Sequence, residues 1–410
     1  MGNTPNIRFK GFTDDWEQRK LGEISSSFEY GLNAAAKEYD GENKYIRITD
    51  IDDDSREFKQ EDITSPDIDL SSAENYRLSE GDILFARTGA SVGKSYIYKV
   101  SDGLVYYAGF LIRARIKSEY NAEFVFQNTF SGDYEKFIKV TSMRSGQPGV
   151  NAQEYSKYQI MVPSKPEQDK ISDSFRSLDN LITLHQRKCD ETKKLKKFML
   201  QKMFPKKDAN KPEIRFAGFT DDWEQRKWID TVDISTEMVD PTTGEYDDMP
   251  HIAPGNIEPF TGRILDNVKT VKEEQLISGK FRFRPNDVVY GKINPQLGKY
   301  FYASIDGLTS ADAYVFNGKN GITQKFLYSV LQTKDFFKYS ISVSKRSGMP
   351  KINRDELNAY SFCVPKEEEQ EKIGDFLLGI DNLITLHQRK CDELKEFKKY
   401  MLQNMFPQKG

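Results

Sequence analysis

The sequence predicts an α+β protein in which one module is written twice. Each copy should hold a mixed α/β globular domain followed by a long helix, with the two helices paired as an antiparallel coiled coil in pseudo-two-fold symmetry. Three observations carry this prediction. Near-identical segments recur about two hundred residues apart, short strand patterns fill the sequence between them, and each copy ends in a long proline-free helical pattern.

The duplication can be read from two repeated segments. Residues 7–20 (IRFKGFTDDWEQRK) recur as 214–227 (IRFAGFTDDWEQRK), and Lys10 against Ala217 is the one difference. Residues 179–191 (DNLITLHQRKCDE) recur unchanged as 381–393. A period this long exceeds the roughly 20 to 50 residues of solenoid repeats, so it indicates a duplicated domain.

The repeat fixes the expected order of parts. The first copy comprises a lead-in at 1–20, a globular domain at 21–163 and a central long helix at 164–204. The second comprises a linker with the repeated lead-in at 205–227, a globular domain at 228–365 and a C-terminal long helix at 366–407.

The globular parts have the pattern of short strands interrupted by turn residues. Four segments of the first domain are rich in β-branched and aromatic residues and are expected to be strands: Tyr45–Ile51, Ile83–Ala86, Ser95–Val100 and Leu111–Ile116. Two segments are expected to be short helices: Asn121–Phe130 and Thr323–Leu331. The pattern leaves the strand order open.

The long helices carry one apolar stripe with steps of three and four residues, as in a coiled-coil seam. Ser164 and Glu167 have capping-box spacing at the start of the first helix. A single helix of the expected length, on the order of 55 Å, is stable only when it packs against a partner helix. The nearest candidate partner is the equivalent helix of the other copy. The residues expected in the helix pairing or in partner binding are Trp16, Ile171, Leu178, Ile182, His185 and Cys189, and Trp223, Ile373, Ile380, Ile384, His387 and Cys391.

Composition limits the class of protein. Of the 410 residues 37% are hydrophobic, and the 30% that are charged nearly cancel to a net charge of −3. A free-standing DNA-binding protein is usually basic overall, so any nucleic-acid surface should be local or completed by a partner. No apolar run reaches membrane-span length, the start MGNTPNIRF lacks a signal-peptide core, and three cysteines suit a reducing compartment. We expect a cytoplasmic protein without membrane contact.

The sequence Gly89-Ala-Ser-Val-Gly93-Lys94-Ser95 resembles a phosphate-binding loop but has three residues between the glycines where that loop needs four. A strand pattern follows it, where the phosphate-binding loop is followed by a helix. The better interpretation is a hairpin loop that presents Lys94, and Lys299 in the second copy. Arg87 and Lys292 lie nearby in the chain.

No catalytic or metal-binding constellation stands out. His185 with Cys189, and His387 with Cys391, have spacings that two crossing helices could join into a zinc site, but all four fall on the apolar stripe and are expected to pack. His251 has Tyr45 as its counterpart, so no histidine-based acid or base is repeated. We expect no catalytic residue and no metal ligand.

Two loops combine arginine, glycine and amide side chains just before the final strand of each domain. Residues 143–151 (MRSGQPGVN) and 345–353 (KRSGMPKIN) suit either DNA contact or a structural turn, and both alternatives remain open. The candidate DNA-contacting residues are Arg87, Thr88, Lys94, Arg144, Ser145, Gln147 and Asn151, and Lys292, Asn294, Lys299, Lys345, Arg346, Ser347, Lys351 and Asn353.

An ordered set of short segments frames each domain. The segment FTDDWE at 12–17, repeated at 219–224, precedes the domain, and Val-Pro followed by Glu-Gln ends it, at 162–163 with 167–168 and again at 364–365 with 369–370. With two diverged domains alternating with near-identical linking segments, the chain resembles the specificity subunit of type I restriction-modification systems over essentially its whole length.

The resemblance implies a non-catalytic DNA reader whose two target-recognition domains each recognise one half of a bipartite target in double-stranded DNA. It also implies two methyltransferase subunits, bound at the repeated helices, that methylate adenine with S-adenosylmethionine. Restriction subunits that use ATP and Mg²⁺ would join them, so this chain itself would hold no cofactor. The alternative function is a coiled-coil scaffold that binds proteins without DNA specificity.

Overall fold

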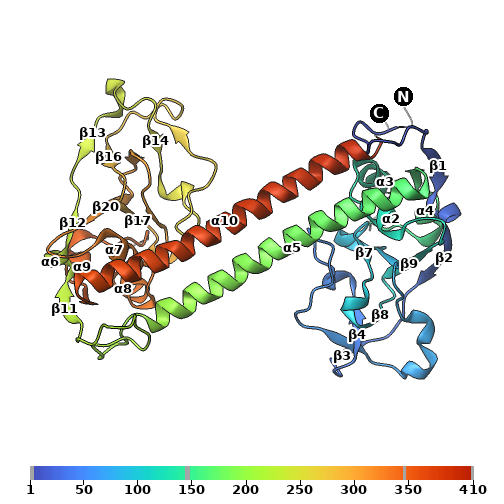
Figure 1. Cartoon of the computed structure of the whole chain (residues 1–410), viewed down its shortest axis with the longest axis horizontal. Helices are drawn as coiled ribbons and strands as arrows, with labels where there is room; N and C mark the ends of the chain where they lie inside the picture. The colour runs from blue at the N-terminus through green and yellow to red at the C-terminus, as the bar shows by residue number, and fades with distance from the viewer. Residues whose placement is uncertain (1–3, 144–147, 345–347, 408–410) are drawn as a thin grey trace. The chain divides into compact units, whose positions relative to one another are not determined.

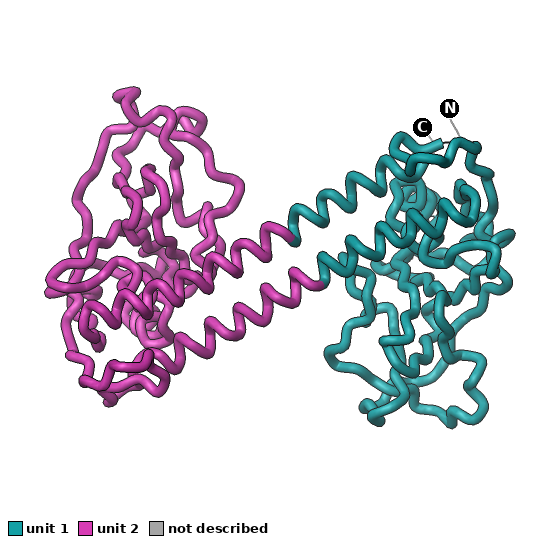
Figure 2. The backbone as a smooth tube through the Cα atoms, viewed as in Figure 1, with its two compact units in different colours: residues 1–183, 391–410 teal, residues 184–390 magenta. Residues whose placement is uncertain are grey.

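The structure is a computed structural model that describes residues 4–143, 148–344 and 348–407. The chain divides into two compact units, Met1–Thr183 with Cys391–Gly410 and Leu184–Lys390 (Figure 2). Each unit holds one globular domain and one part of each long helix, α5 (Lys165–Lys202) and α10 (Glu367–Met405), which are green and red in Figure 1. Within the described ranges, no helix has both the length and the apolar character needed to cross a membrane.

The first unit is centred on an antiparallel four-stranded sheet in the order β2-β9-β6-β7. Its strands are β2 (Ser25–Tyr30), β9 (Leu111–Ile116), β6 (Ile83–Ala86) and β7 (Ser95–Ile97). All four residues of β6 are buried, because its sequence ILFA is apolar throughout and it lies between two other strands. Two further pairs of strands lie within the same domain: β4 (Asn43–Ile46) with β8 (Leu104–Tyr107), and β3 (Ala36–Glu38) with β5 (Thr64–Pro66).

Four short helices belong to the first domain: α1 (Leu21–Ile24), α2 (Ala122–Asn128), α3 (Gly132–Ser142) and α4 (Ala152–Ser156). Asn121 and Ser131 start α2 and α3 by accepting hydrogen bonds from backbone N–H groups of the first turn. Phe124 of α2 packs into the apolar core of the unit.

The second unit repeats the central sheet in the order β12-β20-β17-β18. Its strands are β12 (Val232–Ile234), β20 (Ala313–Gly318), β17 (Val288–Gly291) and β18 (Tyr300–Tyr302). In place of two strand pairs it has a five-stranded sheet made of β13 (Met238–Val239), β16 (Lys280–Phe283), β19 (Gly307–Thr309), β14 (Pro250–His251) and β15 (Lys269–Thr270). Its helices are α6 (Trp228–Thr231), α7 (Gln324–Leu331), α8 (Lys334–Ser344) and α9 (Arg354–Asn358).

A two-stranded sheet closes the base of each domain. In the first unit β1 (Glu17–Lys20) pairs antiparallel with β10 (Gln159–Val162), and in the second β11 (Glu224–Lys227) pairs in the same way with β21 (Ser361–Val364). The strand that enters a domain therefore lies beside the strand that leaves it.

The Glu-Gln pair that follows each Val-Pro ties the long helix to its domain. In the first unit Glu167 accepts two hydrogen bonds from the Arg8 guanidinium, at 2.7 and 2.8 Å, while its own side chain is 1% exposed. Arg215 and Glu369 repeat this clamp in the second unit at 2.6 and 2.8 Å. Glu167 thus binds Arg8, and the capping-box role expected from its spacing with Ser164 is replaced by this long-range pair.

The glutamine beside each clamp serves the same purpose. Gln168 donates to the Pro163 carbonyl at 2.8 Å and accepts from the Asn121 N–H at 2.9 Å. Gln370 donates to the Pro365 carbonyl at 2.9 Å and accepts from the Thr323 N–H at 3.0 Å. Each glutamine therefore bridges the start of a long helix and the start of a domain helix.

The two long helices contact each other inside each unit. In the second unit His185 contacts His387 and Lys196 pairs with Asp381. Residue numbers therefore increase along α5 where they decrease along α10, so the two helices run in opposite directions. In the first unit the Cys391 thiol lies 3.9 Å from the Ile182 carbonyl, and Phe175 stacks on Phe406. The helix segments within each unit are therefore side by side and antiparallel.

Two of the four expected strands have their expected bounds, and the other two are only partly present. Of the segment Ser95–Val100, the strand covers Ser95–Ile97, and Val100 begins a 3₁₀ turn. Of the segment Tyr45–Ile51, only the first two residues are in a strand, because Asp50 accepts from the backbone N–H of Arg47 at 2.9 Å and folds Ile48–Asp50 into a 3₁₀ turn. The long helices expected at 164–204 and 366–407 run over Lys165–Lys202 and Glu367–Met405.

Candidate nucleic-acid interface

The two loops selected from the first copy are joined by main-chain hydrogen bonds. The Gly89 N–H donates to the Pro148 carbonyl at 3.1 Å, and the Val150 N–H donates to the Arg87 carbonyl at 2.9 Å. Thr88 and Gly149 form a β-bridge between these bonds. Residues separated by about sixty positions in the sequence therefore form one surface.

The second unit has the same arrangement. The Asn294 N–H donates to the Pro350 carbonyl at 2.8 Å, and the Ile352 N–H donates to the Lys292 carbonyl at 3.1 Å. Ile293 and Lys351 form the β-bridge. Asn294 adopts a left-handed backbone (φ 50°), as Gly89 does at the matching position (φ 71°). We call the surface built from 87–89 and 148–151 the first reading surface, and that built from 292–294 and 348–354 the second.

Arg87 lies between two aromatic rings on the first reading surface. Its guanidinium carbon is 5.0 Å from the Tyr30 ring centre and 5.9 Å from that of Phe110. Phe110 is 57% exposed and Tyr30 42% exposed, so the stack is open to a ligand. Cation–π contact and flat rings hold the guanidinium in place, which favours its use in planar hydrogen bonding.

Three cations gather on the second reading surface. Lys292 and Arg354 both lie over the Tyr314 ring, at 4.9 and 5.7 Å from its centre, and Lys351 is exposed beside them. Burial, followed by the positive charges of Lys351 and Arg354, lowers the pKa of Lys292. An anion placed here would relieve that repulsion, because opposite charge favours the charged form of lysine.

Lys94 and Lys299 are not presented by their hairpins as expected. Lys94 is 8% exposed and donates to the Ile51 carbonyl at 3.1 Å while pairing with Asp53. The Lys299 ammonium donates to the Ile257 carbonyl. The hairpin prediction itself is confirmed, because β6 and β7 pair antiparallel. The prediction that these two amines face outward is wrong, because each fastens a neighbouring loop.

Asn151 and Asn353 are helix caps. The Asn151 side chain accepts from the Glu154 N–H at 2.9 Å, and Asn353 accepts from the Glu356 N–H at 2.9 Å. Both are exposed, but their side-chain oxygens are used to start α4 and α9. The structural-turn alternative therefore accounts for these two residues. Six other candidates lie outside the described residues: Arg144, Ser145, Gln147, Lys345, Arg346 and Ser347.

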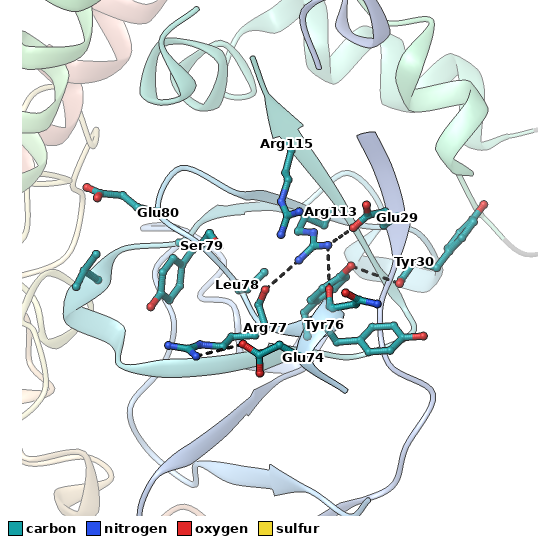
Figure 3. Close-up of a pocket in the computed structure, with 14 residues that line it drawn as sticks. Glu29, Tyr30, Glu74, Tyr76, Arg77, Leu78, Ser79, Glu80, Arg113 and Arg115 are labelled. Carbon is teal, nitrogen blue, oxygen red and sulfur yellow. Dashed lines mark hydrogen bonds and ion pairs between the residues drawn. The ribbon is translucent and has the colours of Figure 1, made fainter. Parts of the chain in front are cut away.

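A cavity of about 870 Å³ adjoins the first reading surface, and Tyr30 lines it (Figure 3). Arg113 lies at its wall, 1% exposed, paired with Glu29 and donating to the Arg77 and Asn75 carbonyls at 3.0 Å. Arg113 is the main opposite charge that lowers the pKa of Glu29, against the effect of burial. The equivalent residue of β20 is the apolar, buried Val315. The two domains therefore differ beside the surfaces that they share.

The residues expected in helix pairing lie where the long helices meet the domains or each other. His185 and His387 approach to 3.1 Å between their Nδ1 atoms, and the Cys189 thiol lies 3.9 Å from the Ile384 carbonyl. Among the described residues, no three His, Cys, Asp or Glu side chains gather as metal ligands would. Ile171, Leu178, Ile373 and Ile380 lie in or against the core of their own unit, whereas Cys391 is buried and Ile182 partly buried outside these clusters.

Trp16 and Trp223 pack inside their units. Trp16 is 1% exposed and meets Phe406, which follows α10, edge to face at 6.2 Å. Trp223 is 2% exposed and meets Phe204, which follows α5, at 5.9 Å. Each tryptophan therefore anchors the end of a long helix, and neither side chain is available to a partner protein.

Several residues of the reading surfaces were not selected from the sequence. Tyr30, Phe110 and Tyr314 hold the cations, and Arg354 adds one. Arg354 follows Asn353 directly, so extending the selected loop by one residue would have included it. No pattern in the sequence brings Tyr30 to Arg87, because they meet only through the pairing of β2, β9 and β6.

The comparison with protein families is clear for both copies. The family described as type I restriction modification DNA specificity domain matches residues 13–194 and 220–396. Among curated proteins, the MjaVIII specificity subunit of Methanocaldococcus jannaschii is 22% identical over 421 aligned positions, covering 95% of this chain and 91% of that subunit. The EcoDI specificity subunit of Escherichia coli is 31% identical over 151 residues, which cover 37% of this chain and 33% of that subunit.

A solved structure shares the fold. The crystal structure of the type I restriction-modification S subunit from M. genitalium aligns with a TM-score of 0.70, covering 99% of this chain and all of that one, at 11% identity. Because the family model covers most of both copies, the chain belongs to the type I restriction-modification DNA specificity family, whose members are non-catalytic subunits.

Proposed function

We propose that this chain selects the DNA target of a type I restriction-modification complex, each domain reading one half of a bipartite site. The observation that carries this proposal is the pair of reading surfaces. Both are built from the same two loops by the same main-chain hydrogen bonds, while their outward side chains differ. A shared frame with different side chains suits two readers of different sequences, because base contacts specify while the frame positions.

The charges on the reading surfaces support contact with DNA. Arg87 is a stacked guanidinium suited to guanine edges or phosphate. Lys292 and Lys351 form a local cationic group on a chain whose net charge is −3, beside Arg354, whose guanidinium donates to the Ile234 and Ser235 carbonyls. We propose that five residues contact DNA bases directly: Arg87, Thr88, Lys292, Asn294 and Lys351. Lys94 and Lys299 are not among the proposed contacts, because their amines bind backbone carbonyls.

The long helices are proposed to pair as an antiparallel coiled coil with pseudo-two-fold symmetry and to set the spacing of the half-sites. The contacts His185–His387 and Lys196–Asp381 in one unit, and Asp179–Lys398 in the other, support this pairing. Matched contacts in the two units support the symmetry.

We also propose that the helices dock two methyltransferase subunits. An exposed apolar stripe occupies equivalent positions in both helices, with three- and eleven-residue steps that keep it on one face. Its members are Leu181, Leu184, Leu195 and Phe198 on α5, and Leu383, Leu386, Phe397 and Tyr400 on α10, between 43% and 53% exposed. Large side chains exposed in a row indicate an interface, and the same row on both helices suits two copies of one partner.

The methyltransferases are proposed to supply S-adenosylmethionine chemistry, and restriction subunits to supply ATP- and Mg²⁺-dependent cleavage, in the cytoplasm. The decisive experiment compares methylomes of cells that express the partner methyltransferase with and without this chain. We expect N6-methyladenine at one two-part motif only when the chain is present. Identical methylomes would refute target selection.

The alternative function is a protein-binding scaffold, which the exposed apolar stripe alone would also fit. Electrophoretic mobility of the assembled complex on target and scrambled duplexes separates the two functions. A specificity subunit retains the target selectively against excess scrambled duplex, whereas a scaffold retains neither in preference.

A further inference from the structure

The second domain contains a cavity of about 780 Å³ between α8, the C-terminal part of α5 and the middle of α10. Its walls include the aromatic rings of Phe260, Phe337, Tyr290 and Tyr300. This volume lies within the roughly 300 to 1,000 Å³ of small-molecule sites. The reading surfaces do not include it.

Two residues that line the cavity are smaller or more polar than their counterparts in the first domain. The helices α3 and α8 each have 11 residues and the same place in the order of elements, so Phe130 and Ile138 correspond to Gln332 and Ser340. In the first domain Arg56 and Lys398 both lie over the Phe130 ring, at 5.7 and 4.5 Å. The first domain therefore has a cation-covered aromatic ring where the second domain has the polar Gln332.

The matching loop shows the same exchange. Arg56 lies in a loop closed by the bridge Ile51–Phe58, and Gly262 has the same position in the loop closed by Ile257–Ile264. Both have left-handed backbones, at φ 59° and 74°. The second domain therefore keeps the loop and removes the side chain that covers Phe130.

One buried polar atom at the cavity has no hydrogen-bond partner among the described residues. Gln332 donates through Nε2 to the Tyr328 carbonyl at 3.3 Å, but its buried Oε1 accepts no hydrogen bond from the described residues. Asp381 beside it is 7% exposed and pairs with the Lys196 ammonium, so its carboxylate already has a partner. A buried acceptor without a donor is costly, so the Gln332 oxygen suits a ligand that brings an N–H group.

The rim of the cavity is basic. Lys193 and Lys197 of α5 and Lys334 of α8 line it and are exposed. Aromatic walls suit a flat ring, the unpartnered Gln332 oxygen suits an amino group on that ring, and exposed ammonium groups suit a phosphate. We propose that this cavity binds a nucleotide whose base carries an exocyclic amino group. The proposal is independent of the reading surfaces.

Isothermal titration of the full chain with AMP tests the proposal. We expect AMP to bind, UMP to bind at least tenfold more weakly because uracil lacks the amino group, and adenosine to bind more weakly because it lacks the phosphate. A duplex oligonucleotide with one unpaired adenosine, compared with the fully paired duplex, separates a free nucleotide from one that belongs to DNA. Either source supports the site, and binding by neither overturns it.

Variants locate the binding. Gln332→Phe and Ser340→Ile restore the side chains of the first domain and should abolish AMP binding, while Ser342→Ile, an exposed residue of the same helix, should not. Lys197→Ala, a surface change that leaves the cavity open, should weaken AMP but not adenosine. AMP binding unchanged in folded Gln332→Phe and Ser340→Ile variants would also overturn the proposal.

Discussion

At the scale of single residues, Arg87 and Lys292 occupy the same position of two equivalent surfaces but carry different cations. Arg87 directly follows β6 and Lys292 directly follows β17, and each lies over an aromatic ring. An arginine offers a planar fork and a lysine a single charged point, so the two positions present different chemistry within one frame.

Arg87→Ala and Lys292→Ala form a matched pair of tests. Each change should reduce recognition of one half-site and leave the other half intact, since a good bidentate base contact contributes about 1 to 3 kcal/mol of discrimination. Sequencing of methylated adenines in cells expressing each variant measures both halves at once. Loss of both halves in either variant would argue against separate readers.

Some of these residues follow from sequence and others do not. Arg87, Lys292 and Lys351 were selected because cations beside glycine or asparagine in loops are visible as a pattern. Lys94 belongs to the same pattern but is held by Asp53 and the Ile51 carbonyl, a contact that only the folded loop creates. The local sequence predicts which chemical groups a loop carries, whereas the direction of a lysine side chain depends on the residues that pack against it in the folded protein.

At the scale of elements, the clamps fix each long helix to its lead-in. Arg8→Ala should lower the free energy of unfolding by roughly 3 to 5 kcal/mol, because it leaves the buried Glu167 carboxylate unpaired. Urea denaturation measures this loss. Arg19→Ala removes a surface pair with Glu17 and should cost at most about 1 kcal/mol. Equal losses in the two variants would show that the clamp is not a buried pair.

The histidine contact gives the helix pairing a dependence on pH. Burial, then the positive charges of His185 and Lys188, lowers the pKa of His387 below its ordinary value of 6.5. A histidine with a lowered pKa in the folded state stabilises the fold above pH 6.5, and this contribution is lost as pH falls through the lowered pKa.

We therefore expect the urea midpoint to fall between pH 7.5 and 5.5 more steeply in the native chain than in a His185→Gln, His387→Gln double variant. Titrating carboxylates contribute equally to both proteins, so the difference isolates the histidines. Parallel curves for the two proteins would contradict this assignment.

The exposed stripe is tested by Leu184→Ser with Leu386→Ser. These residues are 43% and 51% exposed, so their replacement should leave the melting temperature nearly unchanged while weakening methyltransferase binding at least tenfold. Size-exclusion chromatography with light scattering gives the composition of the complex. Undiminished assembly would exclude this face as the docking surface.

The element scale also shows what sequence patterns can predict. The strands Ile83–Ala86 and Leu111–Ile116 have the expected bounds. The first is apolar throughout, and the second keeps alternating apolar residues although Arg113 and Arg115 interrupt it. The clamp between Arg8 and Glu167 joins residues 159 positions apart, so no local pattern reveals it. Both partners do stand in repeated segments, and the repetition was the available signal.

At the scale of the whole chain, both long helices cross from one compact unit to the other. The boundary lies at Thr183 and Leu184 in α5 and at Lys390 and Cys391 in α10. If the helices set the spacing of the half-sites, removing one turn from each should change the length of the spacer and leave both half-sites unchanged.

A variant lacking four residues around Leu195, with the matching four around Phe397, makes this measurable. One turn is about 5.4 Å, which is between one and two base-pair steps at roughly 3.4 Å each. Methylome sequencing reads the spacer directly. An unchanged spacer, or altered half-sites, would contradict the helices as the spacing element.

The paired first and last strands of each domain have a consequence for how such a protein can change during evolution. Because Glu17 lies opposite Val162 and Lys20 opposite Gln159, the chain enters and leaves the first domain at one place. Everything between those strands can be replaced by another domain of any length that starts and ends on the same two strands. The new domain would have to supply again the contacts that Asn121 makes with Gln168 and that Phe124 makes with Trp16 and Phe406. If each domain reads one half-site, as proposed, a single exchange of this kind would change one half of the target and leave the long helices in place.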